Sequence, residues 1–346
     1  MLIEWAERGL IPDPLLRFGM RRLMGARLRA ERGDGGEAQF ARYQARLAEL
    51  REGPVALHTD AANDQHYEVP AAFFEHVLGR YLKYSCALWP PGTESLDDAE
   101  AAMLEVTCQR AGLTDGQRIL ELGCGWGSLS LWMAGRYPGS RITAVSNSAS
   151  QREFIEARAR AAGIVNIEVV TADMNVFETS ERFDRVVSIE MFEHMRNYRE
   201  LLRRVSSWLE ADGRLFVHVF CHREFLYPFE TEGSYDWMAE HFFTGGIMPA
   251  EQMFSWFQED LRLEAQWRVN GMHYARTSNA WLARMDAAED DILRVFSEVY
   301  GGADARRWVQ RWRMFFMAVA ELFGYAGGRE WFVTHALFTQ REAAEA

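Results

Sequence analysis

The middle of the chain alternates short apolar runs with stretches in which apolar residues recur at helical spacing. The apolar runs predict five strands, RILEL (118–122), RITAVS (141–146), NIEVVTAD (166–173), FDRVVSIE (183–190) and RLFVHVF (214–220). Helices are predicted between them, over 126–137, 150–163 and 198–213. The last two end at glycine, which commonly stops a helix. This alternation is typical of an α/β fold, with a parallel sheet and helices on both of its faces.

The segments around this core have different patterns. Residues 1–60 are charged and predicted to be helical, and residues 61–115 form a second helical lead-in to the core at 116–224. Residues 225–330 are rich in aromatic residues and Met, less regular, and predicted to be mostly helical. In the last segment, 331–346, FVTHALF (332–338) predicts a final strand that returns to the sheet. Residues 225–330 would then form a cap over the carboxyl edge of the strands, where ligands bind in such folds.

One basic stretch stands out near the N-terminus. Six arginines between Arg17 and Arg32 alternate with apolar residues at helical spacing. A basic amphipathic helix can lie on an anionic membrane. The alternative is a helix packed on its own domain with its arginines in water, and the composition favours this second interpretation.

Composition narrows the choice of partner and compartment. The formal net charge of −12 argues against nucleic-acid binding, which depends on concentrated Lys and Arg. The four cysteines form no CxxC pair, so neither a zinc site nor a disulfide framework is predicted. The N-terminus lacks the pattern of a signal peptide, and no apolar run reaches the length of a membrane span. These features predict a cytoplasmic enzyme without a metal, and they leave its oligomeric state open.

A glycine-rich turn follows the first predicted strand, reading Glu121-Leu-Gly123-Cys-Gly125-Trp-Gly127. Glycines allow a tight turn and a close approach of a ligand to the backbone. The GxGxG spacing, with an acid two residues before the first glycine, resembles the first motif of class I methyltransferases rather than the GxGxxG of dinucleotide folds. A turn that merely joins strand to helix is the alternative.

Two further strand ends bear on this ligand. The second strand ends Val145-Ser146-Asn147, without the acid that usually holds ribose hydroxyls, and this departs from both the methyltransferase and the dinucleotide pattern. Asp173, after the third strand, is placed either to accept from an adenine amino group or to cap a helix.

A cluster of ionisable residues follows the strand that ends at Ile189. If the chain turns helically there, Glu190, Glu193 and His194 share one face. An acid at a helix N-terminus stabilises the helix dipole by about 0.3–1 kcal/mol, which would account for Glu193 alone. Three such groups at the ligand-binding edge favour a catalytic role.

The chemistry of methyl transfer explains why such a cluster would be useful at this edge. Displacement at a sulfonium methyl needs alignment and a deprotonated nucleophile, but no metal. An aliphatic amine with a pKa near ~10 is only about one part in 10³ neutral at pH 7, whereas a thiol near ~8.5 is about 2 kcal/mol from its reactive form. The cluster therefore suits an amine best. Glu190 or Glu193 would attract the ammonium, and His194, oriented by Glu193, would take its proton.

From about His66 to Phe338 the sequence resembles the cyclopropane-fatty-acid synthase superfamily, and within it the coclaurine-type branch of small-molecule N-methyltransferases. The resemblance rests on eight main segments: HYEVPAAFFEHVLG (66–79), YLKYSCALWP (81–90), ELGCGWGSLSLWMA (121–134), SIEMFEHMRNYRELL (188–202), LFVHVFCH (215–222), FFTGGIMP (242–249), HYARTS (273–278) and EWFVTHALF (330–338), with AELFGY (320–325) between the last two.

This resemblance implies a Rossmann-like class I methyltransferase sheet with a mostly helical cap, and S-adenosylmethionine as cofactor. The implied cofactor contacts, part of them in the lead-in over 61–115, are Tyr84, Ser85, Glu121, Gly123, Gly125, Gln151 and Asp173, with Ser146 or Asn147 in place of the missing ribose acid. Glu193 and His194 form the catalytic pair that it implies, with Glu190 nearby. The expected acceptor contacts are Cys86, His218 and Tyr274, with Phe323 and Trp331 as weaker candidates that are more often core.

The resemblance also bears on the acceptor. The lipid-modifying branch carries Gly where this chain has Glu190, which favours a small cationic acceptor. Cys86, Glu193, His218 and Tyr274 fall where that branch binds a bicarbonate base, so these four positions do not discriminate, and bicarbonate binding stays open. N-methylation of a small amine is the first hypothesis. S-methylation of a small thiol or sulfide, and cyclopropanation or methylation of unsaturated phospholipid chains, are the alternatives, with membrane contact through the basic helix not favoured.

Overall fold

The computed structural model describes residues 2–33, 35–57, 69–229 and 237–341. The chain divides into two compact units. The helical unit comprises Met1–Gln39, Val69–Ala102 and Asn270–Phe332, and the sheet unit comprises Phe40–Glu68, Met103–Val269 and Val333–Ala346. Parts of the predicted segments lie outside the described residues, namely 58–68 in the N-terminal and lead-in segments, 230–236 in the cap and 342–346 after the final strand.

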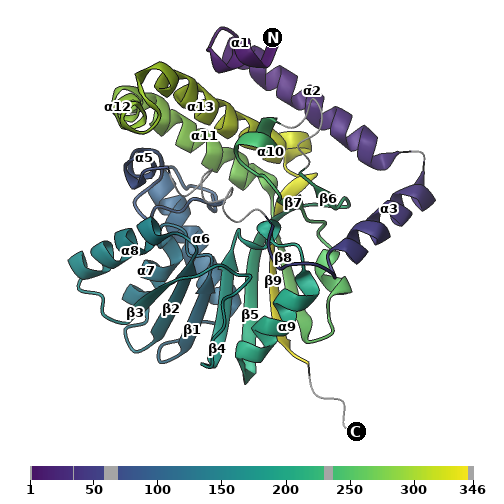
Figure 1. Cartoon of the computed structure of the whole chain (residues 1–346), viewed down its shortest axis with the longest axis vertical. Helices are drawn as coiled ribbons and strands as arrows, with labels where there is room; N and C mark the ends of the chain where they lie inside the picture. Colours follow the sequence, from purple (N-terminus) through teal and green to yellow (C-terminus); the bar gives the residue numbers. More distant parts are fainter. Residues whose placement is uncertain (1, 34, 58–68, 230–236, 342–346) are drawn as a thin grey trace. The chain divides into compact units, whose positions relative to one another are not determined.

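The sheet unit contains a seven-stranded sheet in the order β3-β2-β1-β4-β5-β9-β8 (Figure 1). Strands β1 to β5 pair in parallel, and β8 pairs antiparallel with β9. The strands are β1 (Arg118–Leu122), β2 (Arg141–Ser146), β3 (Ile167–Thr171), β4 (Phe183–Ile189), β5 (Leu209–His222), β8 (Leu261–Val269) and β9 (Trp331–Gln340). The predicted α/β fold class is confirmed.

Helices connect these strands, as the alternating pattern predicted, but the helix predicted over 198–213 ends at Trp208, and residues 209–213 belong to β5. The helices are α7 (Ser128–Arg136), α8 (Ala149–Ala161) and α9 (Tyr198–Trp208), preceded by α3 (Gly36–Glu49) and α6 (Leu96–Ala111). Ser148 caps α8, since its Oγ accepts from the backbone N of Gln151 at 3.3 Å, and Asn197 caps α9 in the same way. Shorter elements complete the unit: η2 (Phe192–His194), β6 (Tyr227–Pro228), α10 (Trp237–His241), β7 (Ile247–Met248) and η3 (Met253–Trp256).

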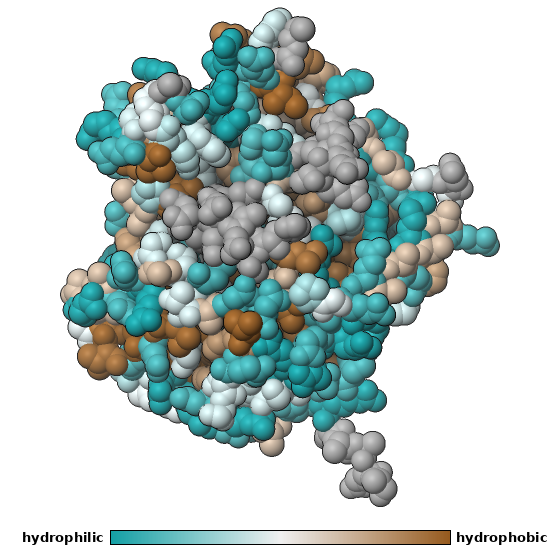
Figure 2. Space-filling model, in the orientation of Figure 1, coloured by the Kyte–Doolittle hydropathy of each residue, from teal (hydrophilic) through white to brown (hydrophobic). Residues whose placement is uncertain are grey.

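The core strands are buried almost throughout, as expected for parallel strands covered on both faces. Every residue of β1 and β2 except the first is buried. One large cluster of buried apolar residues extends from β1 and β4 across β5 to β9 and includes Leu120, Val186, Val217 and Phe338. On the face shown in Figure 2, most of the surface is hydrophilic, and the hydrophobic residues form small separate patches.

Residues 225–330, predicted as one mostly helical cap, are divided between the two units of the structure. The first part belongs to the sheet unit, and Leu261–Val269 is a strand rather than a helix. The residues of β8 alternate between partly buried and exposed, as in a sheet edge that has one wet face. The second part is helical, and the predicted final strand over 332–338 is present as β9.

The helical unit consists of α1 (Leu2–Glu7), α2 (Asp13–Arg32), α5 (Ala71–Val77), α11 (Gly271–Ala287), α12 (Glu289–Tyr300), α13 (Gly302–Gly324) and η4 (Tyr325–Gly327). Its interior is aromatic. The rings of Phe73 and Trp312 lie 4.7 Å apart, and those of Trp281 and Phe316 lie 5.7 Å apart. Such ring pairs add about 0.5–1.5 kcal/mol each beyond the burial of their surface.

The basic stretch forms α2, which packs against α13. Arg17 Nη1 lies 2.9 Å from Glu321 Oε1, and Arg21 Nη1 lies 2.5 Å from Glu321 Oε2. Arg313 of α13 reaches back to Asp13 Oδ2 at 2.8 Å. This arrangement is that of a helix docked on its own unit. Among the described helices, none combines the length and the apolar character needed to cross a bilayer.

Candidate active site

Three loops of the sheet unit meet at one edge of the sheet. In the parallel register, Leu122 of β1 lies beside Val145 of β2 and Ser188 of β4. The loops that follow these strands therefore leave from the same carboxyl edge. Backbone N–H groups of Gly123 and Cys124 both donate to the Val145 carbonyl at 3.0 Å, which ties the first loop to the second strand.

The three glycines of the first loop have different physical roles. All three have positive φ, of 80° at Gly123, 51° at Gly125 and 78° at Gly127. A Cβ at Gly123 would lie 2.8 Å from Met191 Cβ, and one at Gly127 would lie 2.6 Å from Ile155 Cγ1. A Cβ at Gly125 would have no atom within 4 Å. Packing therefore requires the first and third glycine, whereas the second borders open space that a ligand can use.

The acid at the end of β1 is turned inward. Glu121 is buried, and Ser130 Oγ on α7 donates to its Oε2 at 2.5 Å. Burial raises the pKa of Glu121 to about 8, and the Ser130 hydrogen bond opposes this only in part. Glu121 is thus fixed beneath the glycine turn.

The end of β2 carries a polar network in place of the missing acid. Ser146 Oγ donates to Gln151 Oε1 at 2.7 Å and accepts from the backbone N of Ser148 at 3.1 Å. Gln151 is buried, and its Nε2 has no hydrogen-bond partner within the described parts of the chain. A buried donor without a partner costs about 1–3 kcal/mol, so a bound acceptor atom would satisfy it. Asn147 beside it is partly exposed.

Asp173 follows β3 at the same edge and is partly buried. Its Oδ1 accepts from the backbone N of Asn175 at 2.6 Å. The predicted alternative of a helix cap is wrong, because a turn and not a helix follows Asp173, and its carboxylate accepts within that turn. The second carboxylate oxygen belongs to no hydrogen bond of this turn, and the role toward adenine stays a prediction.

The ionisable cluster lies directly after β4, but it does not begin as one helix. Glu190 has a left-handed backbone with φ of 47°, and the helical turn η2 starts only at Phe192. The backbone N of Glu190 donates to the His218 carbonyl at 2.8 Å, and Glu190 Oε1 lies 3.2 Å from His218 Nε2. Glu190 is thus paired with His218 of β5. The sequence analysis placed Glu190 on one helical face with Glu193 and His194 and did not predict this contact.

Glu193 is 1% exposed, and its Oε2 has no hydrogen-bond partner among the described residues. Burial raises its pKa well above the usual range, and the charge of Glu190 raises it further. His194 is partly exposed and stacks on Phe243, with the rings 6.0 Å apart and 15° from parallel. Neighbouring side chains in a 3₁₀ turn point about 120° apart. Glu193 and His194 therefore leave the η2 turn in different directions, and the predicted orientation of His194 by Glu193 stays a prediction.

Three predicted residues of the helical unit lie on one stretch before α6. Tyr84 packs its ring on Phe74 and Trp281, at 5.0 and 5.6 Å. Ser85 is buried, and its hydroxyl accepts from the buried Lys83 ammonium. Cys86 is fully buried, and its carbonyl accepts from Lys83 Nζ at 2.9 Å. Lys83 thus holds Ser85 and Cys86 in place, and the sequence analysis did not predict this role.

The predicted aromatic acceptor contacts also lie in the helical unit. Tyr274 of α11 stacks on Phe323 of α13, with the rings 4.4 Å apart. Trp331 is fully buried and packs edge-on against Tyr325 at 5.5 Å. Both Phe323 and Trp331 are thus part of the packing of this unit, and a role toward the acceptor stays a prediction for all three.

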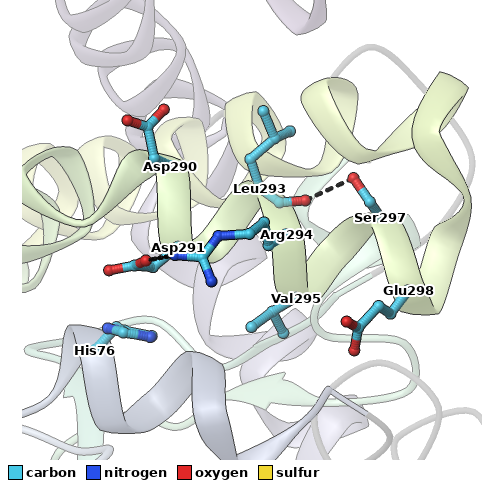
Figure 3. Close-up of a pocket in the computed structure, with 8 residues that line it drawn as sticks. All are labelled: His76, Asp290, Asp291, Leu293, Arg294, Val295, Ser297 and Glu298. Carbon is cyan, nitrogen blue, oxygen red and sulfur yellow. Dashed lines mark hydrogen bonds and ion pairs between the residues drawn. The ribbon is translucent and has the colours of Figure 1, made fainter.

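A surface hollow of about 660 Å³ in the helical unit has none of these residues in its lining (Figure 3). It lies between α5 and α12 and is lined by His76, Asp290, Asp291, Leu293, Arg294, Val295, Ser297 and Glu298. Arg294 pairs with Asp291 one helical turn away, and Ser297 Oγ donates to the Leu293 carbonyl. These are local contacts of a solvated helix, so the hollow is not the candidate site. In the described residues, no group of three or more His, Cys, Asp or Glu side chains is arranged to hold a metal.

Comparison with known proteins identifies the family. The family model of mycolic acid cyclopropane synthetase matches residues 57–326. The chain is 38% identical to the (S)-coclaurine N-methyltransferase of Thalictrum flavum subsp. glaucum, over 98% of this chain and 95% of that one. It is 28% identical to the cyclopropane-fatty-acyl-phospholipid synthase of Escherichia coli K12, over 73% of this chain and 66% of that one.

The solved structures agree with these sequence relatives. A crystal structure of coclaurine N-methyltransferase bound to N-methylheliamine and SAH superposes with a TM-score of 0.94 at 38% identity, covering 98% of this chain and 99% of that one. The predicted fold and the predicted S-adenosylmethionine-dependent methyltransferase activity are confirmed. The chain belongs to the mycolic acid cyclopropane synthetase family.

Proposed function

We propose that this methyltransferase transfers the methyl group of S-adenosylmethionine to the nitrogen of a small amine. The observation that carries the proposal is the pair of carboxyl groups, Glu190 and Glu193, at the edge of the sheet beside the glycine turn. Two acids close enough to perturb each other favour a cation between or beside them. The N-methyltransferase relatives support the same acceptor class.

The cofactor supplies a methyl group on a positively charged sulfur, ready for displacement. The sheet-unit residues that would hold it are Gly125, Gln151, Asp173 and the Ser146–Asn147 strand end, above Glu121. Open space at Gly125 and the unpartnered Gln151 Nε2 fit such a ligand. The contacts predicted at Tyr84 and Ser85, and the acceptor contacts predicted in the helical unit, rest on the family resemblance. No step of the reaction requires a metal.

The two acids would have different tasks. Glu190, whose Oε1 lies 3.2 Å from His218 Nε2, acts as the carboxylate that binds the acceptor ammonium. Glu193 has a raised pKa, so its carboxylate is a stronger base than that of an ordinary Glu. Glu193 together with His194 would remove the proton that the amine must lose before its lone pair can attack the methyl group.

Gly125→Ala is expected to weaken S-adenosylhomocysteine binding by about tenfold while the fold persists. The added methyl group enters the open space where the cofactor would approach. A left-handed backbone costs a non-glycine residue about 1–2 kcal/mol. This cost must be separated from the loss of cofactor binding. Gly163→Ala is the matched control, because Gly163 has φ of 68° and equally open surroundings, at the end of α8. Calorimetric titration and thermal unfolding of both variants provide the test. Equal affinities in the two variants would contradict the assigned cofactor site.

The pH dependence of a His194→Ala variant tests the acceptor class. With an amine, kcat/KM should climb about tenfold per pH unit toward ~10, because the free-amine fraction rises in that proportion. With a thiol acceptor the climb should level off near ~8.5. Profiles measured from pH 6 to 10 on wild type and variant decide between the two. An amine profile that levels off below pH 8 in the variant would count against proton removal by His194.

A further inference from the structure

Four side chains of the sheet unit form a continuous hydrogen-bonded row that ends at the candidate site. Glu190 Oε1 lies 3.2 Å from His218 Nε2, and His218 Nδ1 lies 2.9 Å from His335 Nε2. His335 Nδ1 lies 2.8 Å from Arg110 Nη1. Both imidazoles are 0% exposed. The row therefore continues from the proposed ammonium-binding carboxylate into the interior of the unit.

The sheet itself sets this geometry. Glu190 follows β4, His218 is on β5 and His335 is on β9, and these strands are consecutive in the sheet. Ile189 is in register with His218, which brings the next residue onto the His218 carbonyl. Arg110 comes from the last turn of α6, with its guanidinium 5.2 Å from the centre of the Trp267 ring on β8. Fixed backbone and ring packing thus hold all four groups.

Arg110 fixes which atom donates in each hydrogen bond of the row, because a guanidinium can only donate hydrogen bonds. His335 Nδ1 must then accept, and a neutral imidazole that accepts at Nδ1 carries its proton on Nε2. His335 Nε2–H donates to His218 Nδ1, which fixes the His218 proton on Nε2 in turn. His218 Nε2–H therefore points at the Glu190 carboxylate as a donor.

We infer that His335 and Arg110 are positioning residues, which act through His218 to orient Glu190 and to stabilise its carboxylate form. This inference rests on the proposed role of Glu190 in binding an amine. If Arg110 were absent, His335 Nδ1 would lose the donor that fixes its tautomer, and the row could reverse. His218 would then present an unprotonated Nε2 to the carboxylate, and two lone pairs would face each other.

The variants remove the groups that fix the donor and acceptor roles along the row, and each replaces a side chain by one of similar volume. His335→Leu and Arg110→Met are expected to raise the KM for an amine acceptor about three- to tenfold, with a smaller change in kcat and unchanged cofactor affinity. His335→Gln keeps both a donor and an acceptor, and Arg110→Lys keeps a donor, so these two should recover most of the loss. A purely structural role would not produce recovery that follows hydrogen-bonding capacity.

His222→Asn is the control for loss of a buried histidine from the same strand. His222 Nδ1 accepts from the backbone N of Glu224 at 2.9 Å and of Phe225 at 2.8 Å, outside the row. Asn retains that acceptor, so acceptor KM should stay at the wild-type value. Thermal unfolding of every variant reports whether the fold is kept.

A second readout does not depend on activity. In protein labelled with ¹⁵N-histidine, long-range ¹H–¹⁵N spectra should show His218 and His335 protonated on Nε2 in the wild type, with His335→Leu used for assignment. Arg110→Met should convert part of the His335 population to the Nδ1–H tautomer. A wild-type His218 protonated on Nδ1, or unchanged KM in both His335→Leu and Arg110→Met, would overturn the inference. If no amine is methylated while both tautomers are as expected, the proposed function fails instead.

Discussion

Replacing Glu193 by Gln or His194 by Ala is expected to lower the turnover of an amine acceptor by about 10²–10⁴-fold, the range over which general base catalysis usually acts. The double variant should lose little more than the worse single variant, because the two groups would serve one proton transfer. Cofactor affinity should barely change. Single-turnover rates at saturating cofactor, with calorimetry for cofactor binding, give the two quantities separately.

The stability of Glu193→Gln at raised pH distinguishes a loss of catalysis from damage to the fold. The pKa of Glu193 is raised in the folded chain by burial and by the charge of Glu190. The folded state therefore binds more protons than the unfolded state above the usual pKa of Glu, and stability falls as pH rises through that window. Glu193→Gln removes this penalty, so at pH 8 the variant should unfold no more easily than wild type.

Glu200→Gln is a suitable control, since Glu200 is a partly exposed acid of α9 that pairs with Arg203 outside the cluster. A His194→Ala variant with near-normal turnover at neutral pH would contradict the assignment. The cluster would then only position the acceptor.

Glu190→Gln is expected to raise the KM for an amine by about 10–100-fold and to lower kcat less. A hydrogen bond between charged partners contributes about 1.5–3 kcal/mol, and the neutral amide cannot supply it. Initial rates over a wide range of acceptor concentration measure the effect. An uncharged acceptor analogue serves as the control, because its KM should respond little to the loss of the carboxylate.

The backbone at Glu190 allows a second version of this test. Its φ of 47° costs a residue with a side chain about 1–2 kcal/mol, which glycine avoids. Glu190→Gly should therefore raise KM as much as Glu190→Gln while leaving the free energy of unfolding unchanged or slightly higher. Unaltered KM in both variants would mean that the acceptor does not interact with this carboxylate as a cation.

Much of the sheet unit could be predicted from the sequence, because each strand of a parallel sheet is a short apolar run with a helix after it. The prediction was weakest where the pattern changed. Residues 261–269 alternate strictly between apolar and polar from Leu261 to Val269, a period of two that indicates an edge strand. These residues lie within the aromatic-rich segment 225–330, whose overall pattern predicts mostly helix, and β8 is therefore missing from the predicted strands.

The candidate site was predictable only where its residues lie close together in the sequence. The glycine turn and the Glu190–Glu193–His194 cluster are local motifs, and their spacing carried the argument. His335 is 117 residues from His218, and their contact depends on β9 lying beside β5. The left-handed backbone of Glu190 also has no local signal, and its N–H donates to the carbonyl of His218, which is 28 residues away in the sequence.

The most direct test of the proposed function follows the label of methyl-labelled S-adenosylmethionine in a panel of small amines, small thiols and anionic liposomes. We predict label on the nitrogen of at least one amine, at a rate that falls by two orders of magnitude or more in Glu193→Gln, and no label in extractable lipid. Label in lipid or on sulfur, without an N-methylated product, would contradict the proposal.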